Sequence, residues 1–237
     1  MIFVPPPASL ALLRGVDFAR ASPCLPDAKA IYDGFDASEA GRDDPNRCKA
    51  LLEFPAGGPV FWSAKMAVDA DGPPAGPGLP DGKGLDPASG RPDTSFTFAD
   101  GQGLPSAIVP YIVLPQSRPR SNRPFHPALA IGDLAVVIHG TKIAPAICGD
   151  LGPYRLIGEA SIRVHEDLRQ HGAPDPCKAR DAQGNCLKIL NVSVAEDVLY
   201  FAFPNSALGP RLTLHNAERL IRAGALACFD GLRAAQG

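Results

Sequence analysis

The region from Leu134 to Val164 consists of apolar runs that are interrupted by Gly and Pro. Its first run, residues 134–138, is rich in β-branched residues and ends at His139-Gly140, and its second, residues 143–148, ends at Gly149-Asp150. Both runs have the length and the boundaries of buried β-strands. In the third run, residues 155–164, apolar and polar residues alternate, which predicts a strand with Glu159 on its more polar face.

Two carboxylates, Asp150 and Glu159, lie in these segments, which are otherwise poor in charge. Gly149-Asp-Leu-Gly-Pro-Tyr154 is typical of a tight connection, because Gly permits positive φ and Pro fixes φ. Antiparallel pairing of the flanking strands would bring the two acids together across this connection. Glycosidases need such a pair, about 6.5–9.5 Å apart for inversion and about 5–5.5 Å for retention. Alternatively, the segment is an ordinary turn and Glu159 a surface residue.

Similar patterns predict further strands at residues 60–68, 93–98, 106–114, 187–194 and 198–203. In the first of these, Trp62 shares its parity with Val60, Met66 and Val68, so we expect it to pack in the core rather than to stack on a sugar. Lys65 is on the opposite face. Helices are expected at residues 8–16 and 213–227, the latter with Asn216 as its cap, and in a short piece around residues 48–54.

Composition agrees with a mainly β protein. The chain has 237 residues, with 26 Pro and 24 Gly, about a fifth of the chain, where about 12 % is average for the two together. This favours short strands and long loops over long helices. We expect an N-terminal arm at residues 1–30 and a single β-barrel domain with a C-terminal helix at residues 31–237.

Charge and motifs exclude several classes of function. The net charge of −2 gives no footprint for nucleic acid. No apolar run approaches the ~20 residues that cross a bilayer, and the proline-broken start is not a convincing secretory signal, so either a signal was removed or none exists. Gly-x-Gly-x-x-Gly and Walker loops are absent from the sequence, and the acids at Asp81 and Asp86 miss the spacing of a calcium loop. We expect no cofactor and no metal.

The chain has six cysteines, an even number. None forms a Cys-x-x-Cys motif, and the histidines are not at zinc spacings. Cys177 and Cys186 flank a polar, Gly-containing loop and form the most natural disulfide pair. We interpret the whole set as oxidised, in a secreted or extracytoplasmic protein, with free buried thiols as the alternative.

Several blocks resemble one family of enzymes. Ala146-Ile-Cys-Gly-Asp-Leu-Gly-Pro153 followed by Leu156-Ile-Gly-Glu-Ala-Ser161 is similar to the signature of the chitosanases of glycoside hydrolase family 75. Blocks at residues 60–72, 93–96 and 110–115 come in the same order as in that family, and the resemblance covers about residues 30 to 205. Two departures are Ala70, where the family often has Cys, and the short connection at residues 149–154.

The resemblance implies an endo-acting hydrolase that cleaves β-1,4 links in chitosan, with Asp150 and Glu159 as catalytic residues. From the residues we add an inverting mechanism and acidic side chains that bind the cationic sugar. The predicted substrate-binding residues are Asp69, Asp71, Lys65, Asp36, Asp93 and Tyr154.

Alternatives at this point are a peptidoglycan-cleaving glycosidase delivered by a secretion system and a carbohydrate-binding module without catalysis. A weaker similarity to lytic transglycosylases suggests a barrel of the double-psi type. We expect a monomer whose partner is a polysaccharide, with neither nucleic acid nor membrane. Arg118, Arg120 and Arg123 lie in a Pro-rich loop, where an acidic glycan is a possible contact and a solvated linker the alternative.

Overall fold

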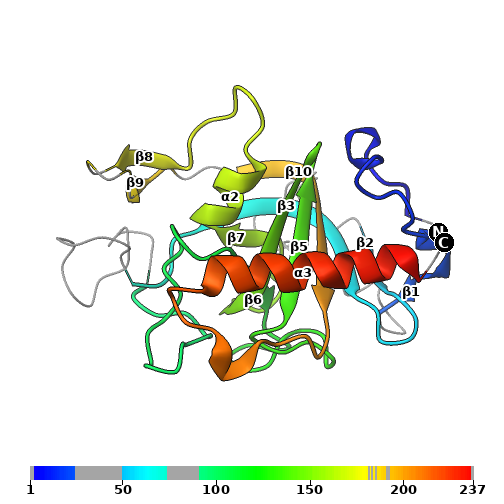
Figure 1. Ribbon diagram of the computed structural model, residues 1–237, viewed down its shortest axis with the longest axis horizontal. Coiled ribbons are helices and arrows are strands. Elements are labelled where there is room, and N and C mark those ends of the chain that lie inside the picture. The colour runs from blue at the N-terminus through cyan, green and yellow to red at the C-terminus, as the bar shows by residue number, and fades with distance from the viewer. Residues whose placement is uncertain are drawn as a thin grey trace.

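Six strands form a closed β-barrel in the computed structural model, which describes residues 3–24, 50–73, 91–180, 182, 184, 186–190 and 193–235 (Figure 1). Around the barrel the order is β3 (Val60–Asp69), β10 (Ser193–Phe203), β5 (Leu134–His139), β6 (Lys142–Gly152), β4 (Tyr111–Pro115) and β7 (Glu159–Ser161). The barrel closes because β7 also pairs with β3. The prediction of a mainly β fold built on a barrel is confirmed.

The strands pair in both directions. The pairs β3–β10, β10–β5, β5–β6 and β4–β7 are antiparallel, whereas β3–β7 and β4–β6 are parallel. Parallel neighbours require crossover connections, so the chain crosses the barrel instead of running up and down around it. The double-psi type of such a barrel stays a prediction. Two short strands, β1 (Ser22–Pro23) and β2 (Ala50–Glu53), extend the sheet beside β3.

Alternation along the strands separates two hydrophobic cores. Inside the barrel, Trp62 has no exposed surface and stacks on Tyr200, with 5.1 Å between the ring centroids, so its predicted place in the core is confirmed. On the outer face, Phe61 packs against Phe201, which also contacts Phe229 of α3 (Ala217–Ala234). This long helix runs across β5 and β6 and covers their outer face (Figure 1).

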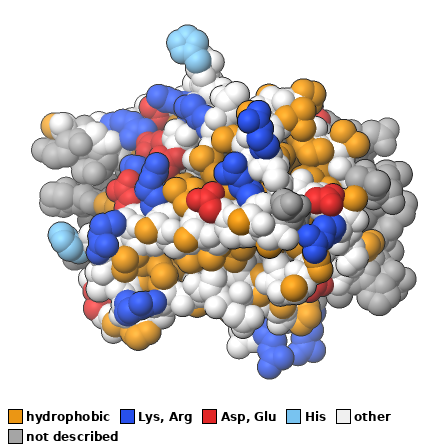
Figure 2. All heavy atoms as spheres, turned by 45° about the vertical axis from the view of Figure 1, so that its right-hand side comes forward, with side chains coloured by type: hydrophobic (Ala, Val, Ile, Leu, Met, Phe, Trp, Pro, Cys, Tyr) orange, Lys and Arg blue, Asp and Glu red, His pale blue; other side chains and the backbone are white. Residues whose placement is uncertain are grey.

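The C-terminal helix is confirmed, but it is longer than predicted. Its apolar stripe continues beyond Ala227 through the buried Phe229 and Leu232, which hold the extra turns on the barrel. Asn216 occupies the N-cap position, although its Oδ1 accepts a hydrogen bond from Thr213 N instead of from the first helical turn. Over the face drawn in Figure 2, acidic and basic side chains are interspersed.

The remaining elements are short. They are the 3₁₀ helices η1 (Pro7–Ser9), η2 (Phe18–Arg20) and η3 (Gly209–Arg211), helix α2 (Ile162–Leu168), and the hairpin strands β8 (Cys177–Arg180) and β9 (Cys186–Ile189). Phe3 and Phe18 pack against Phe61, so the described N-terminal residues lie on the barrel. The division at residue 30 stays a prediction. No helix among the described residues is long and apolar enough to cross a membrane.

Several predicted elements were wrong. Residues 8–16 contain the end of a 3₁₀ helix followed by hydrogen-bonded turns, and Gly15, with a φ of 91°, breaks any helical continuation. The piece around residues 48–54 is helical nowhere in its described part, which is β2 and pairs with β3. Residues 93–98 are irregular apart from one bridge between Thr97 and Gly103. The strand expected at residues 187–194 belongs to two different strands, since β9 ends at Ile189 and β10 begins at Ser193.

The third apolar run, residues 155–164, is also different from the prediction. Only Glu159–Ser161 is a strand, and α2 begins directly after it, with Ser161 Oγ accepting a hydrogen bond from Val164 N. The preceding strand, β6, continues through Gly149 and Asp150 as far as Gly152. The two strands are not paired with each other, because β4 lies between them. The expected antiparallel pairing across a tight turn was therefore wrong.

Candidate active site

Asp150 and Glu159 are brought together by a strand that lies between theirs. Val113 of β4 is the register partner of Asp150 on β6 and of Glu159 on β7. Side chains directly opposite one another project to the same face of a sheet, and adjacent strands are about 4.8 Å apart, so the two Cα atoms are separated by about 10 Å. Both acids project from the outer face of the barrel.

A β-bulge at Gly149 gives Asp150 this orientation. Ile112 pairs with Cys148, but the next residue, Val113, pairs with Asp150, so Gly149 is an extra residue in β6. Without it, Asp150 would project into the barrel, because one residue of shift exchanges the two faces of a strand. A side chain at position 149 would meet the β-carbon of Tyr111 at 2.6 Å and Leu104 Cδ1 at 2.7 Å. Only glycine fits this position without displacement.

The carboxyl group of Asp150 is buried and held by one of its oxygens. Oδ1 accepts hydrogen bonds from Ser95 N at 2.8 Å, Ser95 Oγ at 2.5 Å and Leu151 N at 2.8 Å. None of the described residues donates a hydrogen bond to Oδ2. The arrangement fixes the orientation of the carboxyl group and leaves one oxygen for a water or a substrate.

Asp69 and Asp71 lie where β3 ends, beside Asp150. Oxygen atoms of these three carboxyl groups are within 4.8 Å of one another. Asp69 Oδ1 accepts a hydrogen bond from Asp71 N at 2.7 Å, and Asp71 Oδ1 accepts one from Arg91 N at 2.6 Å. The hypothesis that both acids point toward one cleft agrees with this geometry.

Burial raises the pKa of Asp69 well above its usual range, and the neighbouring charges of Glu159, Asp71 and Asp150 raise it further. The pKa of Asp71 is raised by burial as well, against the hydrogen bond from Arg91 N. Tyr111, which donates its hydroxyl hydrogen to Asp71 O at 2.9 Å, is fully enclosed, and its pKa is raised by burial and by the same acids. Asp69 and Asp71 therefore ionise less readily than free aspartates.

Two cavities meet at the acids. The first, about 400 Å³, is lined by Asp69, Glu159 and Arg120, and the second, about 670 Å³, by Asp93 and Ser95. Asp150 and Asp71 line both cavities, as do Arg91 and Gln116. A continuous groove of this form gives an extended chain access to the carboxyl groups.

The other predicted substrate-binding residues are less closely placed. Asp93 lines the larger cavity, whereas Lys65 is buried on β3, on the same face as Asp69, and lines neither cavity. Tyr154 is exposed and follows Pro153, which lines the smaller cavity, and Arg155 Cζ is 5.0 Å from its ring centroid. Asp36 lies outside the described residues. The binding roles of all four stay predictions.

Sequence reasoning missed three residues that shape the groove, Ser95, Arg91 and Gln116. Ser95 is in the block Asp93-Thr-Ser-Phe96, which resembles a block of the chitosanase family but did not indicate a role for the serine. A serine that is far from an acid in sequence gives no local signal that it will bind that acid. Arg91 and Gln116 contribute through their position beside Asp71 and Asp150, which only the closed barrel defines.

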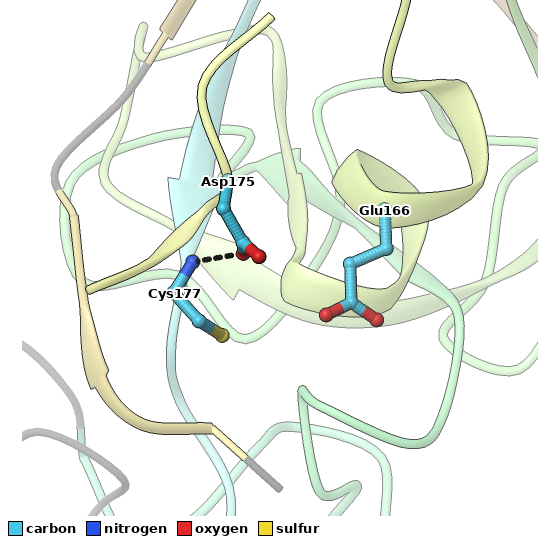
Figure 3. A group of neighbouring side chains, drawn as sticks. All are labelled: Glu166, Asp175 and Cys177. Atoms are coloured by element: carbon cyan, nitrogen blue, oxygen red, sulfur yellow. Dashed lines mark hydrogen bonds between the residues drawn. The ribbon is translucent and has the colours of Figure 1, made fainter. Parts of the chain in front are cut away.

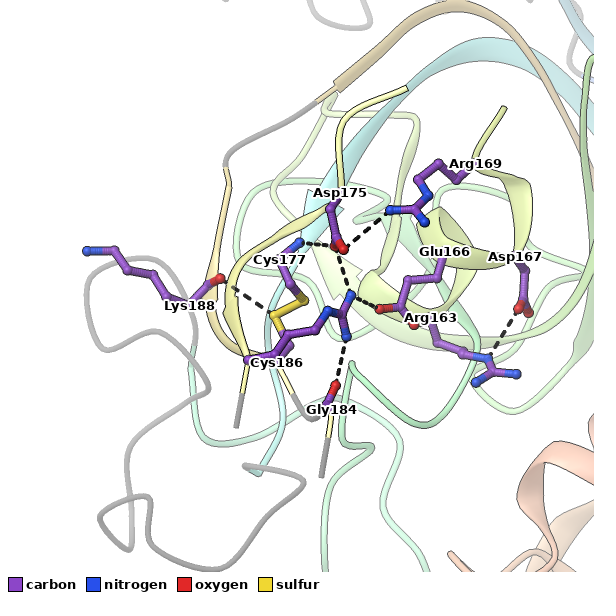
Figure 4. Close-up of polar contacts among 10 residues, drawn as sticks. Arg163, Glu166, Asp167, Arg169, Asp175, Cys177, Gly184, Cys186 and Lys188 are labelled. Atoms are coloured by element: carbon purple, nitrogen blue, oxygen red, sulfur yellow. Dashed lines mark hydrogen bonds and ion pairs between the residues drawn. A yellow bond between two sulfur atoms is a disulfide. The ribbon is translucent and has the colours of Figure 1, made fainter. Parts of the chain in front are cut away.

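A second group of potential metal ligands, Glu166, Asp175 and Cys177, lies near the hairpin of β8 and β9 (Figure 3). Cys177 is bonded to Cys186 in a disulfide, which confirms the predicted pair. Arg180 forms ion pairs with Glu166 and, at 2.8 Å, with Asp175 (Figure 4). These acids are therefore neutralised within the protein, and the group does not have the free ligands of a metal site.

The interpretation of all cysteines as oxidised was wrong for three of them. Cys24, Cys148 and Cys228 have free thiols. Burial raises the pKa of Cys24 to about 12 and that of Cys148 well above its usual value, so these thiols are unreactive core groups. Cys48 lies outside the described residues.

Comparison with known proteins places the chain in a family. No curated protein matches it. The sequence model of the family described as fungal chitosanase of glycosyl hydrolase group 75 matches residues 66–222, which include Asp69, Asp71, Asp150 and Glu159. This match spans about two thirds of the chain, and the chain therefore belongs to this family of glycoside hydrolases.

Proposed function

We propose that the protein is an endo-acting hydrolase of chitosan that uses Asp150 and Glu159 as a pair of acid and base catalysts. The observation that carries the proposal is the position of the two acids on either side of Val113, on one face and at the same groove. The two adjoining cavities share Asp71, Arg91, Gln116 and Asp150, and together they offer room for several consecutive sugar units, as an endo-acting enzyme needs. Family membership supports chitosan as the substrate.

In the proposed mechanism, Glu159 protonates the leaving glycosidic oxygen and Asp150 activates the attacking water. Glu159 is half-buried, and its charge is close enough to Asp69 to act on that carboxyl group; in the proposed role it donates its proton to the leaving oxygen. Asp150 is fixed through Oδ1, so Oδ2 can accept a proton from a water that approaches the opposite face of the sugar. No covalent intermediate forms in this scheme.

Asp69 and Asp71 are proposed to bind protonated glucosamine beside the catalytic pair. An ammonium group that enters the groove favours the charged form of a nearby carboxyl group, so binding of the sugar displaces the protons that these acids retain. An N-acetyl group offers no positive charge and gains no such charge-assisted hydrogen bond.

Substitution of each catalytic acid tests the proposal. Asp150→Asn and Glu159→Gln are each expected to lower the rate of chitosan hydrolysis by about 10²–10⁴-fold, the usual contribution of a general acid or base. Reducing ends released from chitosan, chitin and murein measure the activity, and thermal unfolding shows that each variant is folded. Asp230→Asn, on the exposed face of α3, is the matched control and should retain full activity.

Normal hydrolysis by either folded variant would contradict the assignment of the two acids. Absence of turnover in the parent protein, together with sugar binding that is unchanged by both substitutions, would support a carbohydrate-binding module instead. Equal cleavage of chitosan, chitin and murein would contradict the choice of substrate.

We also propose that the protein acts outside the cytoplasm, where its polymeric substrate is found. The disulfide between Cys177 and Cys186 supports this location, because disulfides persist in oxidising compartments. Mass spectrometry of the protein from its native compartment, with and without reduction, measures whether this bond forms in the cell.

A further inference from the structure

A short loop beside the groove presents three arginines in a defined arrangement. Residues 116–124 turn back on themselves, with a bridge between Gln116 and Pro124 and a hydrogen bond from Ser117 N to Arg123 O of 2.9 Å. Across the loop, the hydroxyl groups of Ser117 and Ser121 are 2.8 Å apart, and Ser121 Oγ also accepts a hydrogen bond from Arg123 N. These contacts fix the loop from within.

The three guanidinium groups, those of Arg118, Arg120 and Arg123, have no acidic partner among the described residues. Four arginines elsewhere in the described part of the chain, residues 163, 169, 180 and 233, are in ion pairs, whereas others are not. Arg118, Arg120 and Arg123 differ from both groups because they line one cavity together. A cavity of about 740 Å³ is lined by Arg118, Arg120, Arg123, Ser117, Ser121 and Asn122. Every one of these side chains offers hydrogen-bond donors, and none of the described residues that line the cavity is acidic.

This basic cavity adjoins the acidic groove. Arg120 also lines the cavity that contains Asp69 and Glu159, and Ser121 and Asn122 line the one that contains Asp150. A uniformly cationic chain that extends from the acids toward the loop would bring ammonium groups close to unpaired guanidinium groups, which repel them. A carboxylate at that position would instead form charge-assisted hydrogen bonds with the planar donors of arginine.

We propose that the loop of residues 116–124 is a binding site for a carboxylate-bearing sugar unit, next to the site that binds glucosamine. The substrate class is then a glycan of mixed charge, with a cationic amino sugar at the acids and a carboxylated sugar at the arginines. The proposal rests on the groove being the substrate site, as proposed above, and it extends the substrate beyond pure chitosan.

Binding to defined tetrasaccharides tests the site independently of turnover. The probes are a neutral chitin tetramer and two carboxylated tetramers of equal length, one of alternating N-acetylglucosamine and N-acetylmuramic acid and one of alternating N-acetylglucosamine and glucuronic acid. Isothermal titration measures Kd for the parent, for Arg120→Gln, and for Arg219→Gln, which removes the same charge from the exposed face of α3.

We expect at least one carboxylated tetramer to bind the parent about tenfold more tightly than the neutral one, as one charged hydrogen bond provides. Arg120→Gln should abolish this preference, whereas Arg219→Gln should retain it, and high salt should weaken it. The tetramer that is preferred identifies where the carboxylate is attached. Equal affinity of the parent for all three tetramers, or a preference that Arg120→Gln leaves intact, would overturn the proposal.

Hydrolysis of chitosan by the parent separates this proposal from the previous one. Turnover of chitosan with no carboxylate preference would retain the proposed function and reject the arginine site. A carboxylate preference without any turnover would retain the arginine site and reject the proposed function.

Discussion

Asp69 is the residue at which the fold places the most unfavourable charge. Its side chain is buried at the end of β3, and the nearby carboxyl groups of Glu159, Asp71 and Asp150 each oppose its ionisation. A residue that served only to end the strand would not need a carboxyl group, because an amide could accept the same hydrogen bond from Asp71 N. An arrangement that lowers stability for no structural gain is typical of a functional site.

Asp69→Asn should therefore stabilise the protein at neutral pH while it impairs the enzyme. Because the folded-state pKa of Asp69 is raised, the native protein holds a proton that the unfolded chain releases above about pH 4. Stability is lost as the pH rises from there, and asparagine removes this loss. We expect the Tm of Asp69→Asn to be higher than that of the parent at pH 7 and equal to it near pH 3. Its kcat/KM for chitosan should be about tenfold lower, because one charged hydrogen bond to the substrate is lost.

Calorimetric Tm measurements across this pH range check the stability, and Asp100→Asn at an exposed turn is the control. A Tm difference that did not change with pH would mean that the pKa of Asp69 is the same in the folded and the unfolded protein. The explanation through a retained proton would then be wrong.

The bulge in β6 is the element on which the position of Asp150 depends. Gly149 contacts two other segments of the chain. Its carbonyl oxygen accepts a hydrogen bond from Phe96 N at 2.9 Å, and its backbone lies too close to Tyr111 of β4 to admit a side chain. The same irregular segment supplies Ser95, which holds Asp150. Residues 93–98 do not form a regular strand. Ser95 N and Phe96 N donate their hydrogen bonds to Asp150 and Gly149 at the bulge, whereas Phe98 N donates to Gln102 O.

Gly149→Ala should lower both stability and activity. The new methyl group would be 2.6 Å from the β-carbon of Tyr111, which is attached directly to the backbone of β4 and cannot rotate away. The strands must separate, which costs about 1–3 kcal/mol, the usual range for overpacking, and displaces Asp150 from its place opposite Val113. We expect kcat to fall by about 10²-fold, as for a small misplacement of a catalytic group.

Urea unfolding and steady-state kinetics measure the two effects of Gly149→Ala. Gly231→Ala in α3 is the control, because a methyl group there meets no atom within 4 Å, and we expect unchanged activity with equal or slightly higher stability. Full activity of Gly149→Ala would show that the bulge does not position the catalytic base.

A similar restriction applies at the other acid. Gly158 has a φ of 80°, and a Cβ there would be 2.3 Å from Lys65 O. The backbone of Gly158 therefore lies directly against β3, where its carbonyl oxygen accepts a hydrogen bond from Ala67 N at 2.9 Å, and this places Glu159 beside that strand.

The helix α2, which follows Ser161, was missed because the alternation of residues 155–164 concealed a second pattern. In that pattern Ser161 caps a helix with Ile162, His165 and Leu168 on its buried side.

At the scale of the molecule, the sequence predicts what is encoded locally. The strands at residues 60–68, 134–138 and 198–203 could be predicted, because each has a continuous apolar or alternating pattern between clear breaks. The identity of the two acids followed from a family resemblance. Their geometry could not be predicted, because β4 lies between β6 and β7 only when the barrel closes, and no local pattern encodes that pairing.

Closure of the barrel also fixes the spacing of the two strands that carry Asp150 and Glu159, on which the proposed stereochemistry depends. Asp150 and Glu159 are on the two strands that flank β4, each paired with Val113. Their Cα atoms are therefore about 10 Å apart, twice the spacing of adjacent strands. The parallel pairing of β3 with β7 holds the far side of this arrangement. Inverting enzymes hold their two carboxyl groups about 6.5–9.5 Å apart, which leaves space for a water between the base and the sugar. We propose that the carboxyl groups carried at this Cα spacing act in the same way.

Proton NMR of the first product released from a chitosan oligomer measures this outcome. Cleavage of a β-link with inversion gives the α-anomer first, and mutarotation then produces the β-anomer more slowly. We expect the α-anomer signal to appear first in the parent and also in the Asp69→Asn variant, because the role proposed for Asp69 is to bind the substrate and not to attack it. A β-anomer formed first would require retention, with Asp150 as a nucleophile and its carboxyl group about 5–5.5 Å from that of Glu159.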